Sequence, residues 1–293
     1  MLLVGEEGVG RRFAVQQLTR ELFCQADKLS SCTCYACKQV RDNVHVDSVH
    51  VQAPEGKEMG VDQIRSLIEE SDGYPLTAPV KIFMIEGVDR MTVAASNALL
   101  KTLEEPPSKV RFFLLAENYS KVIPTIRSRC SRVPFYRLPE TFILSKVQQF
   151  EKDPTKSKVY TRMSEGSVGR AIQYWGAGKI AFRDRVISLL SAAVNKDIPS
   201  VFSLISSVEK ELDLTLKILD QLVHDLLMVR HDAPRMIHLD AQETIVGLRK
   251  SMSDQTWSKL STGLHNLIDL DRRANINLPF HLSTLLVKSF VEV

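Results

Sequence analysis

A glycine-spaced segment near the start of the chain has the form of a phosphate-binding loop. Gly5 and Gly10 are separated by four residues, with Gly8 between them. In such loops glycines let backbone N–H groups surround phosphates at the start of a helix, while a Lys contacts the terminal phosphates and a Ser or Thr holds magnesium. Here Arg11 and Arg12 stand at those two places. Arg11 can still meet a phosphate, although its planar fork is not equivalent to an ammonium, whereas Arg12 cannot ligate magnesium. We expect a strand–helix turn that binds no nucleotide, with a residual nucleotide site as the alternative.

The second half of such a site is expected where a buried strand ends. In nucleotide hydrolases an apolar strand is followed by a magnesium-associated Asp and a catalytic Glu. Here the apolar run Val80–Ile85 is followed by Glu86 and Gly87. Glu86 keeps a carboxylate that could act through magnesium, whereas Gly87 has no side chain to activate water. Because both halves have lost chemical groups, we expect that the chain alone neither binds nor hydrolyses ATP.

Four of the five cysteines lie within fourteen residues, at Cys24, Cys32, Cys34 and Cys37. Four thiolates at this density suit a closed, tetrahedral Zn²⁺ site of the structural type. The spacing is tight, since only Thr33 separates the second and third cysteines. Reduced free thiols are the alternative. Disulfides are not expected, because they are rare in cytoplasmic proteins. A closed site has no open position for a substrate, so we do not expect catalysis by zinc.

The composition is ordinary for a globular protein. The chain has 293 residues, enough for two or three domains, of which 44% are hydrophobic and 25% charged. The net charge of +3 neither requires nor excludes a nucleic-acid partner. No apolar run approaches the roughly 18 residues of a membrane helix, and the first residues do not form a signal peptide. We therefore expect a cytoplasmic protein without a membrane partner.

The elements that must hold these residues alternate between β-prone and helical patterns as far as Pro139. The β-prone runs are Met1–Val4, Asp47–Val51, Val80–Ile85, Arg111–Ala116 and Arg132–Tyr136. The helical patterns between them are Arg12–Phe23, Gly60–Ser71 and Ala94–Leu103. This alternation predicts an α/β domain with a parallel sheet and helices on both faces. In the first helix we expect one apolar stripe, formed by Phe13, Val15, Leu18, Leu22 and Phe23.

Beyond Pro139 the pattern is helical only. Three short helical patterns come first, at Pro139–Gln149, Lys158–Ser164 and Ala171–Trp175, and the chain then breaks at Tyr174–Lys179. Six amphipathic patterns follow, at Arg183–Val194, Val201–Val208, Leu212–Val229, Ala241–Ser251, Asp254–Arg272 and Pro279–Phe290. The last third of the chain is therefore predicted to be an all-helical domain.

Two segments resemble the clamp-loader subunits of bacteria, which are AAA+ proteins that open the sliding clamp and load it on primed DNA. They are "NALLKTLEEPP", Asn97–Pro107, and "IPTIRSRC", Ile123–Cys130. With its degraded phosphate loop and its Glu-Gly pair, the chain is similar to the delta-prime type of subunit. The gamma/tau type resembles it too, but keeps the Lys-Ser/Thr and Asp-Glu pairs. The resemblance covers Met1 to about Trp175 well, and beyond that rests mainly on Arg272–Leu286.

The resemblance implies a fold and a domain order. It implies an AAA+ module at 1–137 with a degenerate nucleotide site and an inserted zinc-binding loop at 24–37, a helical lid at 138–178, and an all-helical collar at 179–293. It also implies a subunit that is not an enzyme on its own and that assembles with gamma/tau and delta subunits of DNA polymerase III. Through that complex it would meet the sliding clamp and primed DNA.

The resemblance gives Arg129, flanked by Ser128 and Cys130, a specific role. In the family this Arg reaches out of its own subunit to the ATP of a neighbour. Arg suits that role because it is always charged and grips phosphate oxygens with a fork of N–H groups. Such an arginine finger can be worth roughly 10³–10⁵ in rate. The alternative is a surface Arg that pairs with a carboxylate. We expect Cys130 to be a small buried thiol rather than a nucleophile.

The chain departs from the family pattern in three places. The family has a segment before the first strand, whereas Met1 lies almost in it, which suggests a truncated or misassigned start. The zinc site of the family has two residues between its second and third ligands, where this chain has one. The second-sensor Arg of active subunits falls on Gly169, with Arg170 one place on. His45 and His50, which follow the four cysteines in the sequence, are expected to be ordinary polar residues.

Three functions fit these residues. The leading one is a non-catalytic clamp-loader subunit that supplies Arg129 to a neighbour. The first alternative is an active ATPase of the same family, in which Arg11 and Glu86 substitute for the usual residues. The second is a zinc-ribbon module that binds nucleic acid by itself, with a steep salt dependence. The low net charge argues against that second alternative.

Overall fold

The computed structural model describes residues 1–24, 26, 32–53, 57–229, 235–273 and 276–291. The chain forms two compact units, Met1–Leu138 and Pro139–Val293. The first unit contains the phosphate-loop segment, the cysteines and Arg129. The second contains helices only, among the residues described.

The first unit is built around a five-stranded parallel sheet, which confirms the predicted α/β class. Its strands are β1 (Leu2–Val4), β2 (Ser48–Gln52), β3 (Lys81–Glu86), β4 (Val110–Ala116) and β5 (Arg132–Pro134), in the order β2-β3-β4-β1-β5. Val4 lies opposite Ala116 and Pro134, and Glu86 lies opposite Leu115. Because the strands are parallel, their carboxyl ends meet at one edge, and the loops that leave this edge can share a site.

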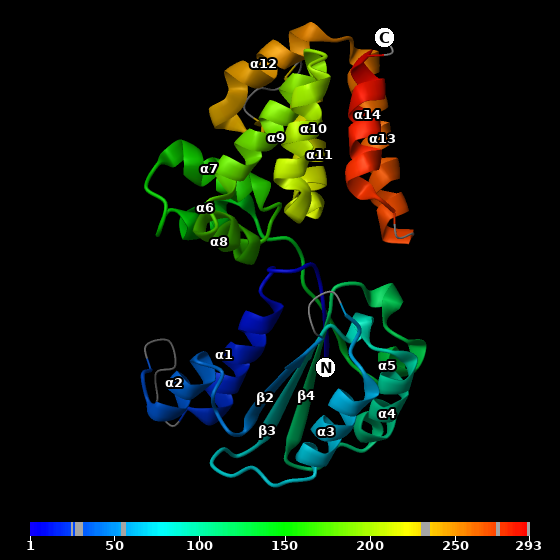
Figure 1. Ribbon diagram of the computed structural model, residues 1–293. Helices are drawn as coiled ribbons and strands as arrows, with labels where there is room; N and C mark the ends of the chain where they lie inside the picture. Colours follow the sequence, from blue (N-terminus) through cyan, green and yellow to red (C-terminus); the bar gives the residue numbers. More distant parts are fainter. Residues whose placement is uncertain (25, 27–31, 54–56, 230–234, 274–275, 292–293) are drawn as a thin grey trace. The chain divides into compact units, whose positions relative to one another are not determined.

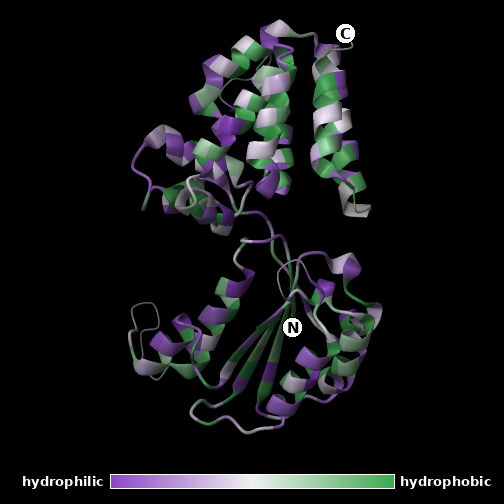
Figure 2. Ribbon diagram, in the orientation of Figure 1, coloured by the Kyte–Doolittle hydropathy of each residue, from purple (hydrophilic) through white to green (hydrophobic). Residues whose placement is uncertain are grey.

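Helices cover both faces of this sheet (Figure 1). The helices are α1 (Arg11–Phe23), α2 (Tyr35–Arg41), α3 (Val61–Ser71), α4 (Val93–Glu104) and α5 (Pro124–Arg129), with 3₁₀ turns η1 (Val88–Arg90) and η2 (Tyr119–Lys121). Ile82 and Met84 of β3 face α1 and α2, whereas Phe83 and Ile85 face α3 and α4. This alternation is the period of two in a strand that is buried on both sides, and Figure 2 shows the strands largely in the hydrophobic colour.

The buried face of α1 differs from the predicted stripe. Two of the five predicted residues, Val15 and Phe23, are buried, but the other three are exposed: Phe13, Leu18 and Leu22. The row that packs inward has a spacing of four and consists of Arg11, Val15, Thr19 and Phe23. Two of its members are polar, so hydrophobicity alone selects the wrong face. Helix α2 is not predicted from the sequence, because its seven residues are too few to show a helical period.

The second unit confirms the predicted helical character in the part of the chain that the structure describes. Its helices are α6 (Glu140–Val147), α7 (Pro154–Met163), α8 (Val168–Gly176), α9 (Lys179–Val194), α10 (Ile198–Val208), α11 (Leu212–Met228), α12 (Gln242–Ser251), α13 (Asp254–Arg273) and α14 (Leu278–Val291). The 3₁₀ turns η3 (Glu209–Glu211) and η5 (Leu239–Ala241) flank α11 and α12. No helix among the described residues has both the length and the apolar character that crossing a membrane requires.

Buried polar contacts join the early and late helices of this unit. Gln221 on α11 donates to the carbonyl of Met163 at the end of α7, with an N–O distance of 3.2 Å. The guanidinium of Arg162 donates to the carbonyl of Met236 at 2.5 Å. These contacts join residues of the predicted lid (138–178) to residues of the predicted collar (179–293). The division into lid and collar stays a prediction.

Candidate functional site

The glycines of the loop after β1 are required by the path of the backbone. Gly8 and Gly10 have φ angles of 75° and 101°, in the left-handed region that favours glycine. A Cβ atom at Gly5 would lie 2.4 Å from the carbonyl oxygen of Phe135, so no larger residue fits there. The glycine frame therefore follows from the turn that joins β1 to α1, whether or not a phosphate is bound.

Arg11, at the lysine place of this loop, has its charge balanced within the chain. It is the first residue of α1 and is only 5% exposed. Its Nη2 lies 4.0 Å from Oε1 of Glu117, which follows β4. Burial raises the pKa of Glu117 above its ordinary value, and the charge of Arg11 opposes that rise. Arg11 thus faces a carboxylate of its own unit.

Glu86, at the metal-associated place, is held by a histidine. His50 Nε2 on β2 lies 3.0 Å from Glu86 Oε2 at the end of β3. The hydrogen bond from His50 lowers the pKa of Glu86 below its ordinary value, and the charges of His50, Arg12 and Arg11 act in the same direction. The two halves of the nucleotide-site frame therefore lie close enough to influence each other.

Gly87, at the place of the catalytic Glu, is fixed as a glycine by conformation. It begins η1 with a φ of 85°. An added Cβ would lie 3.1 Å from the guanidinium of Arg90 and 3.2 Å from Ala53. A glutamate here would be strained by both the backbone and its neighbours. The site therefore offers a single carboxylate, Glu86, at the two acidic places of the motif.

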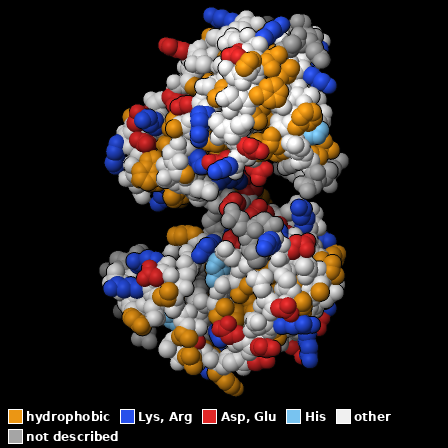
Figure 3. Space-filling model, in the orientation of Figure 1, with side chains coloured by type: hydrophobic (Ala, Val, Ile, Leu, Met, Phe, Trp, Pro, Cys, Tyr) orange, Lys and Arg blue, Asp and Glu red, His pale blue; other side chains and the backbone are white. Residues whose placement is uncertain are grey.

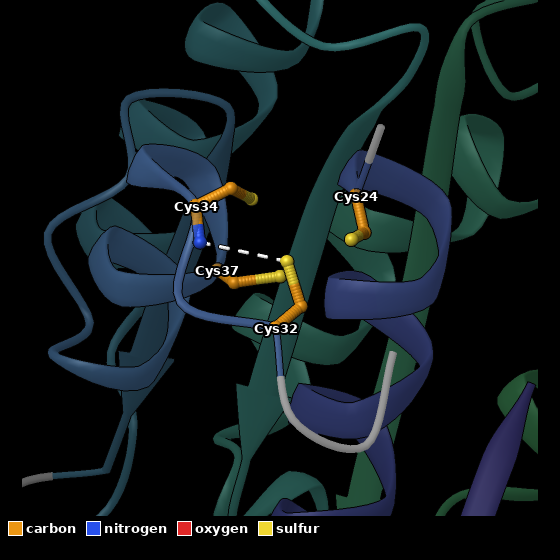
Figure 4. Close-up of side chains that lie close together, drawn as sticks. All are labelled: Cys24, Cys32, Cys34 and Cys37. Atoms are coloured by element: carbon orange, nitrogen blue, oxygen red, sulfur yellow. Dashed lines mark hydrogen bonds between the residues drawn. The ribbon is translucent and has the colours of Figure 1, made fainter. Parts of the chain in front are cut away.

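The four clustered cysteines converge from three pieces of chain (Figure 4). Cys24 caps the end of α1, Cys34 caps the start of α2, and Cys37 lies in the first turn of α2. Cys32 and Cys37 are buried. Residues 25 and 27–31 of the predicted zinc module lie outside the described part of the chain. The cluster thus ties the end of α1 to the start of α2.

The geometry of this cluster suits a metal ion. All four sulfur atoms lie within 4.8 Å of one another. Four sulfurs around one tetrahedral zinc ion are about 3.8 Å apart, for bonds of about 2.3 Å, so a contraction of about 1 Å completes the site. A hydrogen bond from the backbone N–H of Cys37 lowers the pKa of Cys34 to about 7, whereas burial raises the pKa of Cys37 to about 12. Four soft donors at this separation can hold a metal such as zinc.

Arg129, the last residue of α5, lies beside the end of α4. Its Nε is 2.5 Å from Oε1 of Glu104, and its Nη2 contacts the same oxygen. Its Nη1 donates to the carbonyl of Thr125 at 3.0 Å and to Oγ of Ser128 at 3.3 Å. About a third of the side chain, 31%, is exposed. Cys130 is partly rather than fully buried, and burial raises its pKa, which disfavours a reactive thiolate.

Two partners in these sites are missed by the sequence analysis. His50 is expected there to be an ordinary polar residue, yet it is the partner of Glu86. Its place near the carboxyl end of a strand was an available signal, because parallel strands end at one edge. Glu104 lies inside the segment Asn97–Pro107, but its pairing with Arg129 depends on how α4 and α5 pack.

Arg170, which lies one residue beyond the second-sensor place at Gly169, is in the second unit. Its Nη1 on α8 lies 3.4 Å from Oε2 of Glu165.

Comparison with known proteins agrees with the fold. The family model described as DNA polymerase III, delta subunit, matches residues 1–139. A solved DNA polymerase III gamma subunit-related protein from Thermotoga maritima superposes with a TM-score of 0.51 and 16% identity, over 99% of this chain and 93% of that one. At this identity the likeness shows a shared fold alone. The fold class implied by the resemblance, a parallel α/β module followed by helices, is thereby confirmed.

The relatives by sequence are named as subunits of DNA polymerase III. DNA polymerase III subunit delta' of Bacillus subtilis is 30% identical over 173 residues, 59% of this chain and 52% of the relative. The Escherichia coli subunit delta' is 27% identical over 86% of this chain and 77% of its own length. Subunit tau of Bacillus subtilis is 31% identical over 50% of this chain and 26% of the relative. The chain therefore spans about half of the Bacillus subtilis delta' relative. In its matched first unit and in these relatives, the chain is similar to the delta and delta' subunits of DNA polymerase III.

Proposed function

We propose that this chain is a subunit of the bacterial clamp loader that does not hydrolyse ATP itself. It takes part in the ATP-dependent loading of the sliding clamp on primed DNA, in the cytoplasm. Its partners are the gamma/tau and delta subunits, and it meets the clamp and the DNA through the complex. Within that complex it supplies Arg129 to the ATP of a neighbouring gamma/tau-type subunit.

One observation carries the first part of this proposal. The two halves of the nucleotide-site frame lie together, yet the groups that perform the chemistry are absent from it. Arg11 and Arg12 occupy the lysine and hydroxyl places, and Gly87 occupies the place of the catalytic Glu. Arg11 is also buried against Glu117, and Glu86 is engaged by His50. A frame kept for its shape, with its charges balanced internally, is typical of a subunit that does not use its own nucleotide.

The position of Arg129 supports the second part. Its side chain is partly exposed at the end of a short surface helix, and its contacts are made near the surface rather than in the core. An Arg held there can present two N–H groups to a phosphate of another chain. Stabilising charge at a transferred phosphate in this way is worth roughly 10³–10⁵ in rate.

The cysteine cluster is proposed to hold one structural Zn²⁺. The ligands would be Cys24, Cys32, Cys34 and Cys37, and four protein ligands leave no position for a substrate. The ion would fix the end of α1 against α2, on the side of the sheet away from Arg129. Loss of the ion should therefore loosen this part of the unit without altering the Arg129 site directly.

An active ATPase is the second candidate, because Arg11, Arg12 and Glu86 lie close together and Glu86 is ionised. Binding of ATP by the purified chain separates this candidate from the proposal. An autonomous nucleic-acid-binding zinc module has less support. On the face drawn in Figure 3, the described acidic and basic side chains are interspersed over the first unit, without one continuous basic stripe.

Reconstitution tests the proposed function. Gamma/tau and delta subunits are mixed with and without this chain, and two quantities are measured: assembly of the complex, and loading of a labelled clamp on primed DNA. The proposal expects that the chain joins the complex and that loading depends on it. A chain that does not assemble, or a complex that loads equally well without it, would show that the assignment is wrong.

A further inference from the structure

The structure shows Arg129 folded back onto its own unit. One carboxylate oxygen of Glu104 accepts from two of the guanidinium nitrogens, Nε and Nη2. The third nitrogen, Nη1, donates to the carbonyl of Thr125 and to Oγ of Ser128. Ser128 Oγ in turn donates to the same Thr125 carbonyl at 3.0 Å. Every nitrogen of the guanidinium thus already has an acceptor within the chain.

The carboxylate of Glu104 lies at an electrostatically unfavourable end of a helix. Glu104 is the last residue of α4, where the partial negative charge of the helix end disfavours an acid. The positive charge of Arg129 offsets this unfavourable interaction with the helix end, because the ends of α4 and α5 lie side by side. The pair is open to water, with 31% of the Arg129 side chain and 47% of the Glu104 side chain exposed. Pairs this exposed are weak and can be exchanged for another anion.

A guanidinium grips a phosphate with two N–H groups on one edge. The Nε–Nη2 edge of Arg129 is occupied by Glu104. A phosphate that takes this edge must therefore displace the carboxylate. We propose that Glu104 is a positioning residue, which holds Arg129 in a withdrawn position until the nucleotide of the neighbouring subunit displaces it. This inference rests on the proposed role of Arg129 in trans.

The test is Glu104→Gln in the reconstituted loader, with ATPase measured against ATP concentration in the presence of clamp and primed DNA. Removing the charge weakens the pair but keeps an oxygen of similar size. We expect the KM for ATP to fall about two- to fivefold, with kcat unchanged. A change of this size corresponds to the loss of one exposed ion pair. Glu105→Gln is the matched control, because this neighbouring carboxylate is also exposed. It should leave both constants unchanged.

A double variant shows whether the effect passes through Arg129. In the Arg129→Ala background, Glu104→Gln should have no further effect on the KM. An unchanged or higher KM in Glu104→Gln alone, or a lower kcat, would overturn the inference. A different result would contradict the proposed function of Arg129 itself, namely an unchanged ATPase in Arg129→Ala alone. A lower kcat in Arg129→Ala with an unaltered KM in Glu104→Gln would remove only the role of Glu104.

Discussion

His50 Nε2 and Glu86 Oε2 lie 3.0 Å apart across the neighbouring strands β2 and β3. The histidine therefore holds the one carboxylate that remains at the acidic places of the nucleotide motif. Its hydrogen bond keeps the pKa of Glu86 below the ordinary value, so the group is ionised at neutral pH. On the other side of the site, Arg11 faces Glu117. The charges of the degenerate site are thus largely balanced by groups of the chain itself.

The chain alone is expected to show no ATP binding and no magnesium-dependent turnover. Restoring the loop with Arg11→Lys and Arg12→Thr should not create turnover, because Gly87 still has no carboxylate. Adding Gly87→Glu should destabilise the first unit by about 1 kcal/mol or more, since its φ of 85° disfavours any side chain. Calorimetric titration with ATP and an ATPase assay check this. Micromolar binding with turnover in the unaltered chain would contradict it.

One zinc ion per chain is expected in protein that is prepared without chelators. Zinc bound to the folded state stabilises it by about 4 kcal/mol when free zinc is about 1,000 times its Kd. Cys37→Ser should abolish this gain, because Cys37 is a buried member of the cluster. Cys130→Ser is the matched control and should keep its zinc. Metal analysis with thermal unfolding, before and after chelation, measures both effects, and metal-free protein of equal stability would rule out the site.

The buried carboxylate of Asp47 is expected to make the first unit sensitive to acid. Burial acts to raise its pKa, but hydrogen bonds from the backbone of Leu76, Thr77 and Ala78 and from the Thr77 hydroxyl outweigh burial and leave the pKa lowered. A lowered pKa in the folded state contributes stability above the ordinary Asp value of 3.8, and this stability is lost as the pH falls below it. Asp47→Asn should cost about 2–4 kcal/mol at pH 7 and progressively less in acid.

Urea unfolding followed by circular dichroism measures this cost. Both tryptophans, Trp175 and Trp257, lie in the second unit, so their fluorescence in the same titration is an internal control. The fluorescence transition should not shift in Asp47→Asn. An equal loss of stability at neutral and acid pH would show that the charge of Asp47 is not what matters.

The sequence predicts the elements better than the contacts between them. The alternation of apolar runs and helical patterns is a local property, so it predicts all five strands and the change to helices after Pro139. The spacing of Cys24 to Cys37 likewise predicts a cluster, because these cysteines are close in the chain. For α1 the same reasoning is wrong, since its inward row includes the polar residues Arg11 and Thr19.

Pairs of side chains from separate elements are not predicted. Glu104 and Arg129 are 25 residues apart, and His50 and Glu86 are 36 apart. Each pair forms because the packing of helices or the order of strands brings two ends together. A single sequence shows the charges of such residues but not their distances. The role of Arg129 therefore stays a prediction from the resemblance, to which the structure adds its present partner, Glu104.

The most direct test of the account is the ATPase of the reconstituted loader with Arg129→Ala, in the presence of clamp and primed DNA. The variant should fold and assemble normally, since a partly exposed Arg contributes little to stability. Arg127→Ala is the matched control, because Arg127 is on the same helix but lies over the ring of Tyr119, 5.0 Å from its centroid. Turnover at the neighbouring site should fall by about 10³-fold or more in Arg129→Ala. Arg129→Lys should restore little of it, because an ammonium lacks the fork. Equal rates for Arg129→Ala and the unaltered chain would contradict the account.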